Sequence, residues 1–311
     1  MDEGCKDTIV RCVIDGGAAR VVAVTATDLA REAARRHRAT GAAAAAMART
    51  GIAGLLLATL TKDEERVTLQ ILGGGPLGAL TADASASGTV RMLIKHPLPL
   101  AAPAGTRPSL GAAVGRSGIV SVIRDVGLGE NFSGQTAIRD GEIDSDVEGY
   151  LTDSEQIDSA LRCEVLLDDA GAVRAAAGVL VQALPGSGEG ERIAAARARL
   201  QAGALLGLLA GAGAPPDATA VARAALGGDG AAADVALTVL DERPVRFFCP
   251  CSRERAAAAL ALIGDGELAT LIREDGMADV VCDFCRARYD FTDAALEEIR
   301  RAARASPVDP S

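Results

Sequence analysis

The chain has 311 residues, a net charge of −10 and an aromatic share of only 2%. Its length allows two or three domains, and its apolar share of 49% allows a substantial core of aliphatic side chains. An acidic chain repels phosphate groups, which disfavours nucleic acid and anionic membranes as partners. The N-terminus lacks a secretory signal pattern, and the longest uncharged stretch, Leu200 to Pro216, contains several glycines and two prolines. We therefore expect a cytoplasmic protein that does not span a membrane.

Strand and helix patterns alternate over the first 184 residues and are joined by short turns. Alternating or β-branched runs predict strands at 8–14, 19–25, 67–72, 77–84, 89–94, 111–125, 132–138, 161–167 and 173–184. Helices are expected at 27–38, capped by Thr27, at 42–60, and after Ser145, which has the spacing of a capping box with Glu148. The short connections favour antiparallel pairing, so the expected fold class is α+β.

Gly73-Gly74-Gly75-Pro76 interrupts this region and resembles the start of a phosphate-binding loop. No Lys-Ser or Lys-Thr follows it, and a strand is expected where a phosphate loop would open a helix. We interpret it as a turn between strands.

The composition changes at about residue 185, and Ala, Gly and Leu dominate from there to about Leu240. Helices are expected at 192–209, 217–226 and 231–240. Gly203, Gly207 and Gly211 each cost a helix up to about 1 kcal/mol relative to Ala, so these helices should depend on packing against another part of the chain. Both a marginally stable linker and an ordinary small helical subdomain fit this pattern.

Five of the seven aromatic residues lie after Asp241. Strands are expected here at 245–248, 277–281 and 286–291, and helices after the capping residues Ser252 and Thr292. The whole chain is thus expected to comprise an N-terminal mixed α/β domain with an antiparallel sheet at 1–185, a helical linker at 186–240 and a small module at 241–311.

The seven cysteines fall into two groups. Cys12 and Cys163 share strand faces with apolar residues and are expected to be buried, while Cys5 lies near the terminus and carries no signal. The other four form two short-spaced pairs, Cys249-Pro250-Cys251 and Cys282-Asp283-Phe284-Cys285. Two such pairs on separate elements can meet at one tetrahedral ion, and four soft thiolates favour zinc. We predict one zinc ion held by Cys249, Cys251, Cys282 and Cys285.

Zinc at such a site would decide whether the module folds. Structural zinc contributes on the order of 10–16 kcal/mol to a small domain, whose own core supplies only a few kcal/mol. Oxidising the thiolates to disulfides removes the ligands and with them this folding energy. The sequence therefore predicts a redox-controlled order-to-disorder switch whose freed apolar surface could hold unfolded proteins.

Two other classes of function remain open. A thiol-disulfide oxidoreductase could use Cys282 and Cys285, although such enzymes place the reactive pair at a helix start and a strand is expected here. A zinc-finger nucleic-acid binder is disfavoured because residues from Asp241 onward include 14 acidic and 10 basic ones. His37 and His96 are isolated from other ligand types, and we expect neither a histidine metal site nor a catalytic centre.

The chain resembles the redox-regulated heat-shock protein 33 family over nearly its full length. The resemblance is carried by Cys249-x-Cys251-Ser252-Arg253-Glu254-Arg255, Glu274-Asp275-Gly276, Cys282-Asp283-x-Cys285 and Tyr289, and more weakly by Gly73-Gly74-Gly75-Pro76-Leu77 and Ser154-Glu155-Gln156. Two features depart from the family pattern: the linker is unusually poor in charge, and Pro250 stiffens the turn between the first two cysteines.

This resemblance implies an ATP-independent holdase chaperone that is not an enzyme. The reduced protein would bind one zinc ion through Cys249, Cys251, Cys282 and Cys285 and be inactive. Oxidants would form Cys249–Cys251 and Cys282–Cys285 disulfides, release zinc and unfold the module and the linker. The oxidised homodimer would then bind unfolding client proteins.

Overall fold

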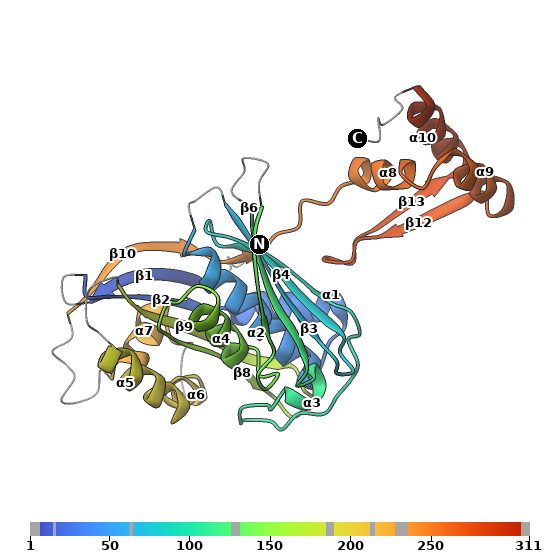
Figure 1. The fold of residues 1–311 in the computed structure, drawn as a ribbon. Coiled ribbons are helices and arrows are strands. Elements are labelled where there is room, and N and C mark those ends of the chain that lie inside the picture. Colours follow the sequence, from blue (N-terminus) through green and yellow to red (C-terminus); the bar gives the residue numbers. More distant parts are fainter. Residues whose placement is uncertain are drawn as a thin grey trace. The chain divides into compact units, whose positions relative to one another are not determined.

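The computed structural model describes residues 7–14, 17–61, 65–125, 131–184, 190–211, 215–227 and 236–305. The chain divides into two compact units, Met1–Phe248 and Cys249–Ser311 (Figure 1). Both units combine helices with antiparallel strand pairs, so the expected α+β class is confirmed. The domain boundaries at residues 185 and 240 stay a prediction.

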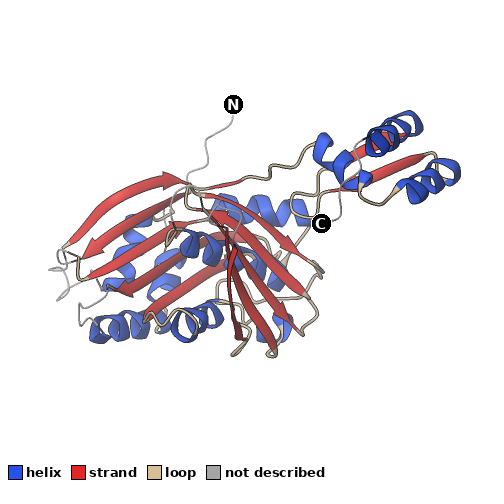
Figure 2. Ribbon diagram, turned by 45° about the horizontal axis from the view of Figure 1, so that its top comes forward, coloured by secondary structure: helices blue, strands red, loops and turns tan. Residues whose placement is uncertain are grey.

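Two sheets form the framework of unit 1 (Figure 2). Sheet A has the strand order β10 (Leu237–Pro244), β1 (Thr8–Ile14), β2 (Ala19–Thr25), β9 (Val173–Ala183) and β8 (Ser159–Leu167). Sheet B has the order β11 (Arg246–Phe247), β5 (Thr89–Ile94), β4 (Ala79–Ser85), β3 (Arg66–Gly73), β6 (Gly118–Asp125) and β7 (Asn131–Ala137). All neighbours are antiparallel except β11 and β5, which run parallel.

Helix α2 (Gly41–Ala58) is the centre of unit 1, and all 18 of its residues are buried. It packs against strands of both sheets and against α1 (Thr27–His37). Small side chains permit this close approach: a Cβ at Gly51 would lie 2.1 Å from the sulfur of Met92. By length and composition α2 could cross a membrane, but its complete burial identifies it as a core helix of this unit.

Three helices of the Ala- and Gly-rich region cover the other face of sheet A. They are α5 (Gly190–Gln201), α6 (Ala204–Ala210) and α7 (Ala218–Leu226). Their apolar side chains form a second core with residues of β1, β2, β8 and β9. The helix expected at 192–209 is divided at Gly203, whose φ of +93° suits glycine and ends the first piece.

Two expectations about secondary structure are wrong. The predicted helix at 231–240 fails because residues 237–240 belong to strand β10, of which residues 237–239 pair with β1 and Leu240 lies at a register shift. Residues 228–235 lie outside the described residues. The predicted strand at 111–125 begins instead as the short helix α3 (Gly111–Val114), because the Glu142 carboxylate accepts hydrogen bonds from the amides of Leu110 and Gly111.

The capping box expected at Ser145 is also wrong. Helix α4 (Asp144–Asp153) is capped by Asp146, whose carboxylate accepts the Ile143 amide at 3.2 Å. Glu148 instead accepts the amide of Leu161 on β8 at 2.8 Å and so ties the helix to sheet A.

Asp7, rather than Thr27, caps helix α1. Its two carboxylate oxygens accept the amides of Thr27 and Leu29 at 2.9 and 2.8 Å. The side chain lies in the interior, with 3% of the residue exposed. Burial raises its pKa to about 6, although the hydrogen bonds from Leu29 and Thr27 partly offset the shift.

This raised pKa makes the stability of unit 1 depend on pH. Because the folded state keeps the Asp7 proton to a higher pH than the unfolded state does, its contribution falls as pH rises from about 4 to 6. Two pKa units correspond to about 3 kcal/mol. We expect the unfolding free energy of the parent relative to Asp7→Asn to fall over this range, as measured by urea titration with circular dichroism. A relative gain with rising pH would contradict the assignment.

Unit 2 is built on the hairpin of β12 (Met277–Val281) and β13 (Arg288–Thr292), packed with α8 (Arg253–Ala261), α9 (Asp265–Glu274) and α10 (Asp293–Ala305). The Ser252 cap on α8 is confirmed, because its hydroxyl accepts the Arg255 amide at 3.3 Å. Helix α9 was not expected from the sequence. Among the described residues its apolar core has four buried side chains, those of Ala256, Leu268, Phe291 and Leu296, with nine more partly buried against them. Such a core is too small to account for a stable fold.

Candidate metal centre

Four thiols converge in unit 2. The sulfur atoms of Cys249, Cys251, Cys282 and Cys285 all lie within 4.8 Å of one another. The separations are 3.7 Å between Cys249 and Cys282 and 3.1 Å between Cys251 and Cys285. Cys285 is buried and the other three are partly exposed. Among the described residues, these four cysteines are the one group of His, Cys, Asp or Glu side chains close enough together to surround an ion.

Local backbone structure positions each pair of thiols in the cluster. Cys249 and Cys251 lie on a segment without regular secondary structure that ends at the capped start of α8. Cys282 and Cys285 occupy the connection between β12 and β13, closed by hydrogen bonds from the Cys282 amide to Ala287 and from the Arg286 amide to Cys282. Arg286 has a φ of 60°, which turns the chain back into β13.

The donor set fits a tetrahedral zinc ion. Four sulfurs at about 2.3 Å from zinc are about 3.8 Å from one another. The separations of 3.1 Å and 3.7 Å given above and the upper bound of 4.8 Å for all the pairs bracket that value. Thiolates without carboxylate or water ligands form a closed, structural type of site.

Tyr289 of β13 completes the surroundings of the sulfurs. Its hydroxyl donates to the Cys251 sulfur at 3.1 Å. Partial burial opposes ionisation of Cys251, but the Tyr289 hydroxyl and the neighbouring thiols lower its pKa to about 7. Burial raises the pKa of Cys285, and the bond to Cys251 raises the pKa of Tyr289 to about 12. The cluster therefore stabilises negative charge at Cys251, as a cation ligand requires.

Tyr289→Phe should weaken metal binding without unfolding the reduced protein. The ring stays in place, but the hydrogen bond to Cys251 is lost, and partners of this kind contribute about 10- to 100-fold to metal affinity. Competition with a chromophoric chelator measures the change. An affinity equal to that of the parent would show that the hydroxyl does not support the site.

The remaining sequence candidates lie elsewhere. Cys12 and Cys163 are buried on strands β1 and β8, as expected, and Cys5 lies outside the described residues. His37 is buried with Nε2 3.1 Å from the carbonyl oxygen of Met92, whereas His96 is exposed. Neither histidine is among the metal-ligand group.

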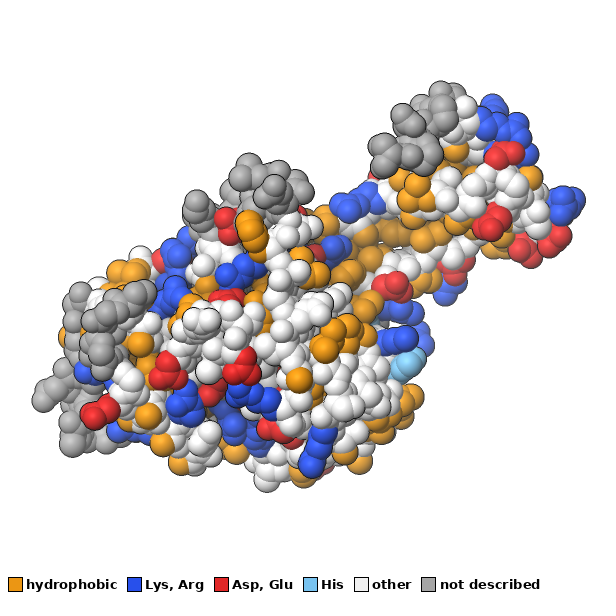
Figure 3. Space-filling model, in the orientation of Figure 1, with side chains coloured by type: hydrophobic (Ala, Val, Ile, Leu, Met, Phe, Trp, Pro, Cys, Tyr) orange, Lys and Arg blue, Asp and Glu red, His pale blue; other side chains and the backbone are white. Residues whose placement is uncertain are grey.

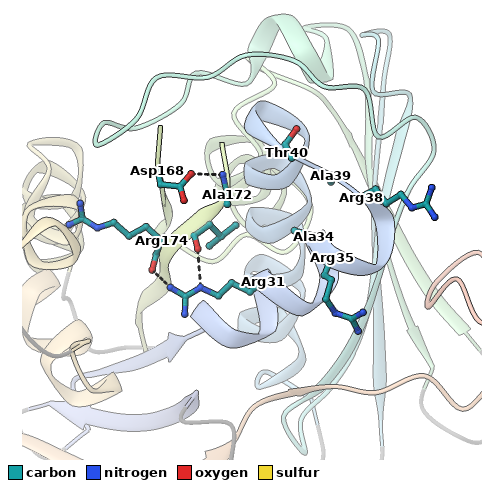
Figure 4. A pocket seen from close by; sticks show the side chains of 10 residues that line it. Arg31, Ala34, Arg35, Arg38, Ala39, Thr40, Asp168, Ala172 and Arg174 are labelled. Carbon is teal, nitrogen blue, oxygen red and sulfur yellow. Dashed lines mark hydrogen bonds between the residues drawn. The ribbon is translucent and has the colours of Figure 1, made fainter. Parts of the chain in front are cut away.

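Unit 1 also has an open pocket of about 620 Å³ beside α1 (Figure 4). Arg31 is fixed there by donating to the carbonyls of Val173 and Arg174. Figure 4 shows Arg35 and Arg38 pointing to a different side from Arg174. The guanidinium groups therefore do not converge on one ligand position.

The site and its surroundings bear on the two alternative functions. The Cys282–Cys285 pair lies in a hairpin connection, not at a helix start that would activate a redox thiol. Acidic and basic side chains are intermingled on the visible face of unit 2 (Figure 3), whereas a nucleic-acid surface requires a basic patch. Both alternatives lose support.

The fold and the site define an α+β protein with a four-cysteine module that could hold a metal ion. The family model described as Hsp33 protein matches residues 7–292. The chain belongs to the Hsp33 family.

Known relatives match nearly the entire chain. The 33 kDa chaperonin of Listeria innocua is 36% identical over 301 residues, covering 96% of this chain and all of the relative. The 33 kDa chaperonin of Bacillus subtilis is 36% identical, covering 94% of this chain and 98% of the relative. The crystal structure of the Thermotoga maritima 33 kDa chaperonin matches with a TM-score of 0.83 at 27% identity, covering 97% of this chain and 100% of that one.

Proposed function

We propose that this protein is a redox-regulated, ATP-independent holdase that protects unfolding proteins under oxidative stress. The observation that carries the proposal is the cluster of four sulfurs within 4.8 Å, in a unit whose described residues include a core of four buried apolar side chains with others partly buried around them. A fold that depends on so few contacts needs its cross-link, so chemistry at the sulfurs controls its order. Family membership supports the same function.

In the reduced state, Cys249, Cys251, Cys282 and Cys285 would hold one zinc ion, which supplies a cross-link between the α8 and hairpin segments. Tyr289 keeps a hydrogen bond on the Cys251 sulfur. Four sulfur ligands would leave no coordination position on the zinc ion open for a substrate. The proposed role is therefore binding rather than catalysis.

Oxidation would proceed in two-electron steps. One peroxide molecule takes two electrons from a pair of thiols, forms one S–S bond and leaves as two molecules of water. We propose the pairs Cys249–Cys251 and Cys282–Cys285, a pairing supported by the family resemblance. A disulfide sulfur is a poor ligand, so zinc would leave and unit 2 would lose its order.

The freed chain would bind exposed apolar segments of client proteins. It would do so as a homodimer and in the cytoplasm.

The test is suppression of aggregation of a thermally unfolding protein by this chain, with metal release measured in parallel. Peroxide with mild heat should release one zinc per chain and produce suppression that the reduced chain lacks. Equal suppression by both forms would mean that no redox switch exists.

A further inference from the structure

One segment of unit 1 forms an edge of both sheets. Residues Leu237–Phe247, here called the strap, contribute β10 to the edge of sheet A and β11 to the edge of sheet B (Figure 1). Strand β10 pairs with β1 along the whole of that strand, from Thr8 opposite Pro244 to Ile14 opposite Leu237. The strap therefore covers backbone groups of β1 that would otherwise lie at an open sheet edge.

Strand β10 is held by its backbone pairing with β1, by partial packing of Leu237 against the second core and by Arg243, which donates to the Ala86 carbonyl at 3.1 Å. None of its eight side chains is buried, and Val239 and Leu240 are 45% and 62% exposed. Asp241 makes an ion pair with Arg11 at 3.3 Å, a contact that is partly exposed. A strand attached in this way can be replaced by another extended chain of almost any sequence.

The buried anchors of the strap lie at its other end. Val245 is fully buried in the core, and Phe247 packs against the core under the guanidinium of Arg36, 4.8 Å from the ring centre. Only Phe248 separates these anchors from Cys249. Loss of order that spreads back from Cys249 therefore acts first on the end that fixes the strap.

Strand β1, with which the strap pairs, is suited to pairing with a new strand. Strand β1 reads Thr-Ile-Val-Arg-Cys-Val-Ile, is rich in β-branched residues and carries a single charge at Arg11. Strand β10 instead ends in Asp241-Glu242-Arg243-Pro244, the charged and proline-containing type of sequence that protects an outer edge from pairing. Removing the strap exchanges a protected edge for an unprotected one.

We infer that an extended segment of an unfolded client adds to the vacated edge of β1 as a new strand. This rests on the proposed chaperone function and names the surface it would use. A second copy of the chain is a poorer occupant, because antiparallel pairing of β1 about its own centre places Arg11 opposite Arg11, and like charges directly opposite are destabilising. A client segment has no such restriction.

Hydrogen exchange on the full oxidised chain tests the inference. Amides of β1 should exchange about tenfold or more faster after activation without client, as expected for lost edge hydrogen bonds, and should regain protection in an isolated client complex. Strand β8, at the opposite edge of sheet A, is the internal control and should not respond to client. A strap that stays paired, or β1 amides that stay exposed in the client complex, would overturn the inference. Protection that returns without client as protein concentration rises would assign the edge to a second copy and also overturn it.

A variant tests the same surface without oxidation. Adjacent residues of a strand direct their amides to opposite sides, so the double change Thr238→Pro and Val239→Pro removes one donor facing β1 whichever residue carries it. The reduced variant should retain its metal and suppress client aggregation, whereas Thr238→Ala with Val239→Ala, which keeps both amides, should behave as the reduced parent.

The outcomes separate the inference from the function on which it rests. An oxidised parent that suppresses no aggregation refutes the proposed function. An active oxidised parent, together with a proline variant whose strap is released but which binds no client, refutes edge addition alone.

Discussion

Cys282→Ser should yield a reduced protein that is purified without metal and in which residues 249–305 are unfolded. The change removes one of four sulfurs that lie within 4.8 Å of one another. Structural zinc contributes on the order of 10–16 kcal/mol, more than a core of this size can replace. Elemental analysis measures the metal, and limited proteolysis followed by mass spectrometry locates the unfolded residues. Outside residues 237–247, the described residues of unit 1 should stay resistant, because its two cores contain no residue of unit 2.

Cys163→Ser is the matched control for this experiment. Cys163 is fully buried in the core of unit 1 and is not part of the thiol cluster. Serine there buries a hydroxyl and costs unit 1 about 1–3 kcal/mol, but metal content should not change. Retention of metal by the Cys282 variant, with loss in the Cys163 variant, would reverse our assignment of the site.

Arg49→Met should lower the unfolding free energy of unit 1 by about 3–5 kcal/mol, the usual cost of removing one partner from a buried ion pair. Arg49 lies in the middle of the core helix α2 with no exposed surface. It pairs with Glu142 at 3.1 Å and donates to the Pro108 carbonyl at 2.9 Å. Methionine has a similar length but leaves both acceptors without this donor. Urea unfolding followed by circular dichroism measures the loss.

Arg35→Met is the corresponding control on the surface. Arg35 also makes an ion pair, at 2.8 Å with Glu32, but its side chain is 70% exposed. Exposed pairs contribute about 0–1 kcal/mol, so the variant should stay close to the parent. If the two substitutions lower the unfolding free energy equally, burial of Arg49 is not the cause of its larger expected loss.

Short-range patterns predicted the grouping of the four cysteines and most strands. The two cysteine pairs could be assigned from their spacing because each pair needs only its own turn to present two sulfurs. Alternation placed Cys12 and Cys163 on buried faces because strand geometry fixes which side chains share a face.

Features that depend on distant partners could not be read from local sequence. The cap on α1 comes from Asp7, twenty residues before Thr27 in the chain. Residues 237–240 have an apolar pattern that suits a helix, and they form a strand because the edge of β1 supplies hydrogen-bond partners. Arg49 lies in an Ala-rich helix, and its neighbours in the sequence do not show that it forms an ion pair with the distant Glu142. In each case tertiary structure overrides the local preference.

The central claim is that metal bound to the four cysteines maintains the fold of unit 2. Hydrogen exchange of the thiol-reduced chain, before and after a chelator has removed all metal, tests it most directly. Our account predicts that amides of β12 and β13 lose their protection while those of α2 keep theirs. Unchanged protection of β12 and β13 in the metal-free, reduced chain would contradict the claim.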